Sequence, residues 1–189
     1  MSNFSPDSTW RWSFCDKQQS LVLNIGDSFQ FVSVINDKNC ANPQDCEQSF
    51  LPEHLAYYSS LLDQMDNLDW PFETKLHIVL QALANGFFHK PIMPQSWHFQ
   101  IAASSIRWNQ NTDFQCGDIV VLRNLDDQVG RFLVIETSYQ TACCMLIDPV
   151  LKLDDRKQLQ QFQMIKVMTD RLQDLSQVMG SQNGYSKVG

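Results

Sequence analysis

The segment Lys90-Pro91-Ile92-Met93-Pro94 divides the chain into two parts with different hydrophobic patterns. Its two proline rings fix φ and favour extended backbone in the preceding residues, so the segment is neither helix nor central strand. Amphipathic helix patterns occur only before it, whereas short strand patterns dominate after about residue 104. We therefore expect an α+β protein, with an N-terminal α/β domain over 1–103 and a C-terminal β-barrel-like domain over 104–172.

Residues 10–35 show the alternation that is typical of half-buried strands. Trp10-Arg11-Trp12-Ser13-Phe14 alternates aromatic and polar side chains, and two further strand-like runs follow at 21–25 and 29–34. The Gly26-Asp27 pair between those two runs is a turn signal, which favours a hairpin. The alternation places both tryptophans of the first run in the core.

Two helices are predicted after a long polar loop over 36–51, at about 52–66 and 71–86. A proline at the first turn of each helix costs no hydrogen bond, and Gly86 stands where a C-cap glycine belongs. At helical spacing the first helix would face the core with Leu55, Tyr58, Leu62 and Met65, and the second with Phe72, Leu76, Val79, Leu80 and Leu83.

The chain after the proline segment predicts only short strands. A strand over 96–101 is followed by strands over 118–122, 131–136, 141–147, 150–153 and 162–168. Short strands at this spacing suggest a small barrel or sandwich. Residues 173–189 are polar and rich in Gly and Ser, so we expect a disordered tail.

The net charge of −7 arises from one segment of the 189-residue chain. Between Asn36 and Glu73, Lys38 is the only cation against eight acids, so that segment alone accounts for the whole net charge. The net charge therefore argues against a generally basic nucleic-acid-binding surface, but not against a local basic patch elsewhere. No apolar run exceeds six residues, and the N-terminus has no signal-peptide pattern, so we expect a cytoplasmic protein with reduced cysteines.

No sequence motif indicates an enzyme, a metal site or a cofactor. The six cysteines contain no Cys-x-x-Cys pair and the four histidines no His-Glu-x-x-His pattern. The chain contains neither a Gly-rich phosphate loop nor a Gly-x-Ser-x-Gly nucleophile motif. We therefore expect no catalytic residue, no metal ion, no cofactor, no nucleic acid and no membrane insertion.

Three segments together resemble the ZapC family of cell-division proteins, which associate with the FtsZ ring in gammaproteobacteria. They are Trp10-Arg11-Trp12 with the strands after it, Lys90-Pro91-Ile92-Met93-Pro94-Gln95-Ser96-Trp97-His98-Phe99, and Ile165-Lys166-Val167-Met168-Thr169-Asp170-Arg171-Leu172. Their order and spacing also fit, and the similarity covers roughly residues 9–172, although it is poor through 36–70. The resemblance implies a non-enzymatic protein that binds FtsZ polymers directly, bundles them laterally and stabilises the Z ring at midcell.

The resemblance also implies candidate partner-binding residues. Lys90 and Arg171 match basic positions of the family motifs, and Leu23 matches an apolar position on the second strand. Three residues within the resembling segments complete the candidate set, namely Lys166, Trp97 and His98. We expect the protein to be a monomer or to self-associate weakly.

The basic candidates allow two interpretations. Lys90, Lys166 and Arg171 would form an electropositive groove for an acidic segment of FtsZ, or they are solvated surface charges, with Arg171 paired to Asp170 or to a helix end. Gln95 stands where the family pattern has a lysine, so one positive charge is missing from that groove. Bundling also requires two binding surfaces per molecule or self-association.

Two other functions stay open. A Cys-based hydrolase would need a cysteine with a perturbed pKa beside His89 or His98. A nucleic-acid-binding barrel would use Arg107, Arg123 and Arg131 with aromatic stacking, although the net charge argues against it.

Overall fold

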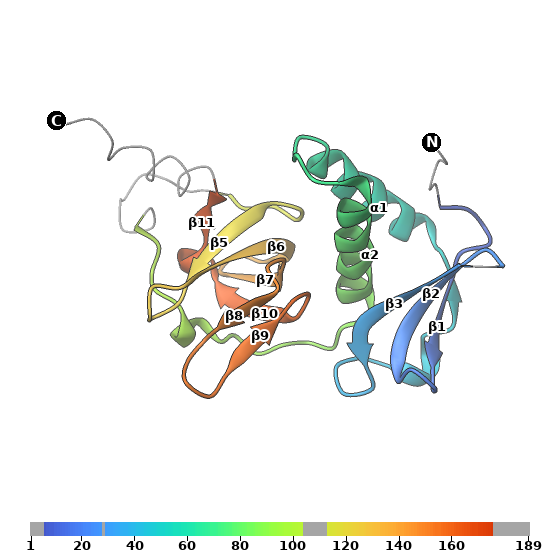
Figure 1. Cartoon of the computed structure of the whole chain (residues 1–189), viewed down its shortest axis with the longest axis horizontal. Helices are drawn as coiled ribbons and strands as arrows, with labels where there is room; N and C mark the ends of the chain where they lie inside the picture. The colour runs from blue at the N-terminus through green and yellow to red at the C-terminus, as the bar shows by residue number, and fades with distance from the viewer. Residues whose placement is uncertain (1–5, 28, 104–112, 176–189) are drawn as a thin grey trace. The chain divides into compact units, whose positions relative to one another are not determined.

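The computed structural model describes residues 6–27, 29–103 and 113–175, and the chain divides into two compact units, Met1–Pro91 and Ile92–Gly189 (Figure 1). The described residues form an α+β structure with antiparallel sheets and two α-helices, neither of which is long and apolar enough to span a membrane. Residues 92–103 group with the second unit and not, as expected, with the first. Their backbone explains this, because the N–H groups of Gln95 and Ala102 donate to carbonyl oxygens of that unit.

Four antiparallel strands form the sheet of the first unit, in the order β3-β2-β1-β4. The strands are β1 (Arg11–Cys15), β2 (Ser20–Ile25), β3 (Phe29–Asn36) and β4 (Gln48–Ser49). The predicted hairpin is confirmed, and Gly26 at its turn has a φ of 61°, which suits a residue without a Cβ. Trp10 and Trp12 are buried, as their alternation predicts.

The helices α1 (Pro52–Met65) and α2 (Phe72–Phe88) lie where they are predicted, but of the four predicted core residues of α1 only Tyr58 and Met65 are buried. Leu55 is 42% exposed and Leu62 is half-buried. His54 takes the core position instead, since its Nδ1 accepts the N–H of Leu51 at 3.0 Å and its ring packs edge-on against Phe87. The buried residues of the helix are His54, Tyr58, Leu61 and Met65.

The predicted C-cap at Gly86 is wrong, because α2 continues through this glycine and ends at Phe88. The N–H of His89 still donates to the Asn85 carbonyl oxygen at 3.3 Å, and the backbone becomes extended only at His89. Phe88 is buried, with its ring centroid 5.0 Å from that of Trp12. Burial of this aromatic side chain therefore outweighs the tendency of glycine to end a helix.

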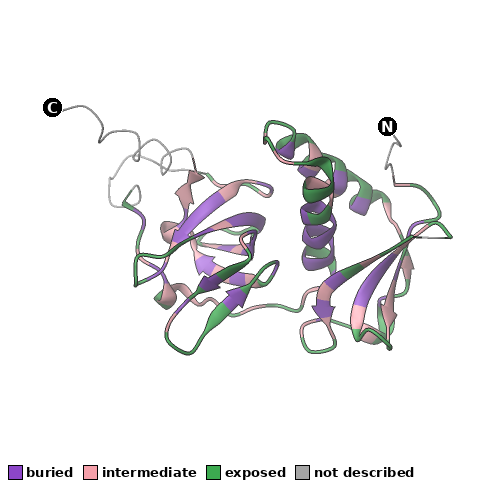
Figure 2. Ribbon diagram, viewed as in Figure 1, coloured by how far each residue is buried: buried purple, intermediate pink, exposed green. Residues whose placement is uncertain are grey.

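The side chain of Gln81 on α2 covers part of the outer edge of β3, which is an edge strand. Its Oε1 accepts the N–H of Val34 at 3.1 Å, and its Nε2 donates to the Val32 carbonyl oxygen at 3.4 Å. Gln81 is itself buried, like most of α2 (Figure 2). Because an edge strand with unpaired backbone groups is a template for other chains, this contact protects the sheet.

The second unit contains a five-stranded sheet, in the order β10-β7-β6-β5-β11, and the hairpin β8-β9. A closed barrel is not found among the described residues. The tail prediction is wrong at residues 173–174, which pair with β5, while 176–189 lie outside the described residues. The strands are β5 (Ile119–Arg123), β6 (Val129–Thr137), β7 (Thr141–Leu146), β8 (Val150–Lys152), β9 (Gln158–Gln160), β10 (Met164–Met168) and β11 (Gln173–Asp174).

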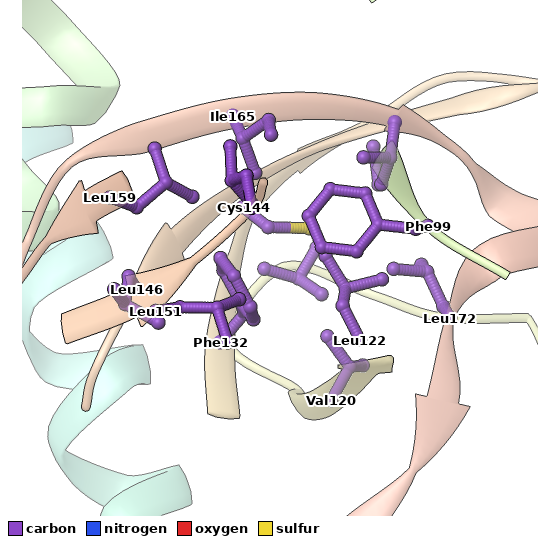
Figure 3. Packing of buried hydrophobic residues seen from close by; sticks show 14 residues of the cluster. Phe99, Val120, Leu122, Phe132, Cys144, Leu146, Leu151, Leu159, Ile165 and Leu172 are labelled. Carbon is purple, nitrogen blue, oxygen red and sulfur yellow. The ribbon is translucent and has the colours of Figure 1, made fainter. Parts of the chain in front are cut away.

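A cluster of buried apolar side chains forms the core of the second unit (Figure 3). Phe99 reaches this core, with its ring edge-on to Phe132 at a centroid distance of 6.4 Å. The strand predicted over 96–101 is nevertheless absent. Ser96–His98 is a short 3-10 helix, η2, and Phe99 forms a single bridge with Asn124. The apolar pattern at 97–101 therefore reflects one buried aromatic position, and not a strand face.

Candidate partner-binding surfaces

Lys90 lies at the end of α2, where residues 38–41, here called the strap, run beside it. The Lys90 N–H donates to the Asn39 carbonyl oxygen at 2.8 Å, and the Lys90 Nζ donates to the Lys38 carbonyl oxygen. Lys90 is exposed, so its charge is held in place and still faces solvent. Two further backbone contacts join the strap to the end of α2. The Ala41 N–H donates to the Phe88 carbonyl oxygen at 2.7 Å, and Cys40 and His89 form an antiparallel β-bridge.

His89 adds no positive charge beside Lys90 near neutral pH. Burial lowers the pKa of its imidazole, and the charge of Lys90 acts in the same direction. The His89 Nδ1 lies 2.7 Å from the Lys90 carbonyl oxygen, which only accepts, so Nδ1 carries the proton of the neutral ring. The positive charges of this surface are therefore those of Lys90 and the exposed Lys38.

Residues 93–98, here called the Trp97 segment, are fixed to strand β10. The Gln95 N–H donates to the Lys166 carbonyl oxygen at 2.8 Å. The Met168 N–H donates to the Ser96 Oγ at 2.7 Å. These two contacts bind the segment to backbone of a regular strand, so its side chains project from a rigid support.

The Trp97 segment presents large apolar side chains to solvent. Met93 is 80% exposed and Trp97 is 65% exposed. His98 instead turns towards Asp154, with 3.7 Å between its Nδ1 and the Asp154 Oδ2, and its side chain is only 12% exposed. Burial lowers the pKa of His98, as does the charge of Lys157, so the ring contributes no charge to the surface at neutral pH. Exposed Trp and Met side chains on a rigid backbone are typical anchors of protein interfaces.

A positive charge does lie beside position 95, although residue 95 itself is glutamine. The Lys157 Nζ, from the loop between β8 and β9, donates to the Gln95 Oε1. Lys157 is exposed. No local sequence pattern points to Lys157, since it lies 62 positions from Gln95 along the chain.

The side chains of Lys166 and Arg171 are partly buried, and each interacts with a neighbouring residue. Lys166 is half-buried on β10, opposite Cys143 of β7, where its charge opposes the burial that raises the pKa of the Cys143 thiol. The Arg171 Nε lies 3.4 Å from the Asp170 Oδ1, and the Arg171 side chain is 20% exposed. Of the alternatives open for Arg171, the pairing with Asp170 is the one that this structure contains.

Leu23 belongs to the core of the first unit. Its side chain is fully buried, and in the sheet it lies between Trp12 of β1 and Phe31 of β3. In this structure Leu23 therefore presents no surface to a partner. Lys90 also belongs to the first unit, and the other four candidates belong to the second.

The contacts of the thiols and arginines favour neither alternative function. Burial raises the pKa of Cys144 and raises that of Cys46 to about 12, the opposite of what an activated nucleophile requires. Arg131 binds Asp148 through its Nε at 2.8 Å and its Nη2 at 2.6 Å, so its charge is already paired. Arg107 lies outside the described residues. The described residues also contain no group of three or more His, Cys, Asp or Glu side chains placed to hold a metal ion.

Comparison with known proteins identifies the family. The model described as "Cell-division protein ZapC, N-terminal" matches residues 3–90, and that described as "Cell-division protein ZapC, C-terminal" matches residues 91–178. Similar curated proteins include "Cell division protein ZapC" of Proteus mirabilis (strain HI4320), 32% identical over 169 residues that cover 89% of each chain. The protein of the same name from Aliivibrio salmonicida (strain LFI1238) is 29% identical over 185 residues, covering 97% of this chain and 98% of that one. The chain therefore belongs to the ZapC family of cell-division proteins.

Proposed function

We propose that this cell-division protein binds FtsZ polymers directly, promotes their lateral bundling and so stabilises the Z ring at midcell, without catalysing a reaction. The observation that carries the proposal is the 65% exposed Trp97 on a segment fixed to β10. This segment lies in the long run of residues that resembles the ZapC family. A tryptophan held in solvent by a rigid backbone loses little side-chain entropy on binding, so it favours a protein partner.

The charges around Trp97 favour an acidic partner segment. Lys157 contacts Gln95 and faces solvent, and it replaces the positive charge that the family pattern would have at position 95. Lys166 lies on the strand that supports the segment. An acidic and apolar segment of FtsZ would bury the Trp97 and Met93 side chains, while these ammonium groups would speed its association.

Bundling follows if each unit contributes its own contact surface. We assign the exposed Lys38 and Lys90 to a first surface, and the Trp97 segment with Lys157 to a second one. A molecule with two such surfaces bridges two filaments as a monomer. Arg171, paired with Asp170, and His98, turned towards Asp154, then position the second surface and do not carry its charge.

Leu23 acts in this proposal through the fold. Its fully buried side chain packs in the sheet whose strand β3 leads into the strap beside Lys90. A polar substitution at Leu23 would therefore weaken binding by unfolding the first unit.

Sedimentation of GTP-assembled FtsZ with and without this protein tests the proposal. We expect this protein in the pellet, together with more FtsZ than in its absence. Trp97→Ala should reduce both amounts, and Lys90→Glu should reduce them most at low salt, where charge attraction is least screened. Absence of this protein from the pellet at both low and high salt would overturn the proposal.

Matched control variants show whether an effect on binding comes from the proposed surfaces or from any loss of exposed apolar area or positive charge. Tyr139→Ala removes an aromatic side chain that is 96% exposed in the β6–β7 turn of the same unit. Lys75→Glu makes the same charge change as Lys90→Glu but lies within α2, about 20 Å from the last residue of that helix at 1.5 Å per residue. Both controls should pellet like the unaltered protein.

A further inference from the structure

Two cysteines of the loop before α1 lie with their sulfur atoms in contact. The distance between the Sγ atoms of Cys40 and Cys46 is 3.2 Å, and the two residues are 5% and 2% exposed. The short 3-10 helix η1 (Pro43–Asp45) reverses the chain between them. The Cys46 Sγ also donates to the Asn42 carbonyl oxygen at 2.9 Å. Since each thiol has one proton, the Cys40 thiol then donates to the Cys46 sulfur.

The same loop holds the end of α2. Cys40 is the strap residue that forms the bridge with His89, and its neighbours Asn39 and Ala41 make the backbone hydrogen bonds to Lys90 and Phe88. A covalent bond from Cys40 to Cys46 would therefore lie within the structure that holds Lys90, and outside the paired strands of the sheet.

We propose that Cys40 and Cys46 form a modification site, a dithiol that hydrogen peroxide oxidises to an intramolecular disulfide and that thiols reduce again. In the first step one thiolate attacks the peroxide, and the O–O bond breaks to give a sulfenic acid and hydroxide, which takes up a proton to form water. In the second step the other sulfur attacks the sulfenic sulfur, forming the S–S bond and releasing a second water. The peroxide is reduced by two electrons, and the two thiols together supply them.

The geometry favours the second step over further oxidation of either sulfur. The attacking sulfur already touches its target, and an approach of about 1.2 Å brings the pair to the bond length of ~2.05 Å. Burial makes the first step slow, because it raises the pKa of the Cys46 thiol to about 12 and so keeps that sulfur protonated. The pair should therefore remain reduced at low peroxide concentration and respond to sustained oxidation.

The test uses the full-length protein treated with hydrogen peroxide under native conditions, then alkylated and cleaved before aspartate. Asp45 lies between the two cysteines, so a disulfide would hold the fragments 37–44 and 45–62 together. We expect the joined fragments after oxidation of the folded protein, a mass about 2 Da below that of the two reduced fragments, and their separation by dithiothreitol. Two separate fragments, each with an alkylated or singly oxidised cysteine, would overturn the proposal.

Two comparisons make the result specific to the native contact. Cys40→Ser should abolish the joined fragments and Cys15→Ser, which changes a half-buried cysteine on β1, should leave them unchanged. Joined fragments that appear only when urea is present during oxidation would also overturn the proposal. Hydrogen exchange at the Lys90 amide should be slower in the oxidised than in the reduced protein, because the strap then has fewer open states. None of these measurements involves FtsZ, so their outcome is independent of the proposed function.

Discussion

The hydroxyl oxygen of Ser96 accepts the backbone N–H of Met168 at 2.7 Å. Ser96 is the residue immediately before the exposed Trp97, and Met168 ends strand β10. One side-chain hydrogen bond thus connects the two segments of the second unit that carry the family resemblance. This contact gives the serine in Ser96-Trp97-His98 a physical role, because it fixes the backbone from which the tryptophan projects.

Ser96→Ala should lower the free energy of unfolding by about 1 kcal/mol, the usual net contribution of such a hydrogen bond. It should also weaken co-sedimentation with FtsZ, since Trp97 would project from a looser segment. Urea unfolding and the sedimentation assay measure the two effects. Ser96→Thr retains the hydroxyl and should restore both, and equal weakening by Thr and Ala would show that the hydroxyl is not responsible.

Gln81→Met should destabilise the first unit and promote self-association. The substitution keeps a similar volume on α2 but removes both hydrogen bonds to the edge of β3. We expect a loss of about 1–2 kcal/mol from the backbone groups of Val32 and Val34 that lose their partner. Thermal unfolding measures the loss, and sedimentation velocity detects the association of exposed strand edges. A stable and strictly monomeric variant would contradict the protective role of Gln81.

Stability should decrease as the pH falls below about 6.5, and His54 should contribute to the decrease. Burial lowers the pKa of this imidazole in the folded protein from its ordinary value of 6.5, and its Nδ1 accepts the Leu51 N–H. As the pH falls, the imidazole of the unfolded chain therefore binds a proton before that of the folded protein does. The stability that the neutral His54 contributes is intact above the pKa of the unfolded state and is lost as the pH falls towards the pKa of the folded state. Urea unfolding from pH 8 to pH 5 measures this dependence.

His54→Gln supplies the control for this pH dependence. Glutamine offers an uncharged acceptor near the Leu51 N–H and does not titrate, so the variant should be less stable at pH 8 but should lose less stability on acidification. His77, His89 and His98 also have pKa values lowered mainly by burial, so some acid sensitivity should remain. An unchanged slope in His54→Gln would exclude His54 as a contributor.

The elements that the sequence predicted well are those set by local signals. Pro52 marks the first turn of α1, the Gly26 hairpin joins the second and third strands, and Trp10 and Trp12 alternate with polar residues as their burial requires. The errors arose where distant contacts decide the structure. The buried face of α1 differs from the predicted one because the ring of His54 packs on Phe87. Helix α2 continues beyond Gly86 because Phe88 packs on Trp12 in the core.

The candidate surface was less predictable than the fold, because its parts meet only in space. The resemblance to the family pointed to the Trp97 segment. It did not predict the hydrogen bond between Ser96 and Met168 or the contact between Lys157 and Gln95. An apolar residue such as Leu23 looks the same in sequence whether it lies in a core or on a surface, and the structure places it in the core. The sequence alone therefore identifies which residues belong to a family motif. It does not show which of them would contact a partner and which only stabilise the fold.

Lys157→Glu should weaken the association with FtsZ more than an equal charge change next to it. Lys157 is the exposed ammonium that contacts Gln95, and its reversal would place a negative charge where the proposed acidic segment binds. Arg156→Glu is the matched control, since Arg156 is exposed in the same loop and only its backbone N–H contacts Asp154. The double variant Gln95→Lys with Lys157→Gln moves the charge to position 95 and should restore binding. Sedimentation at two salt concentrations measures these effects, and equal losses for Lys157→Glu and Arg156→Glu would indicate a general effect of net charge.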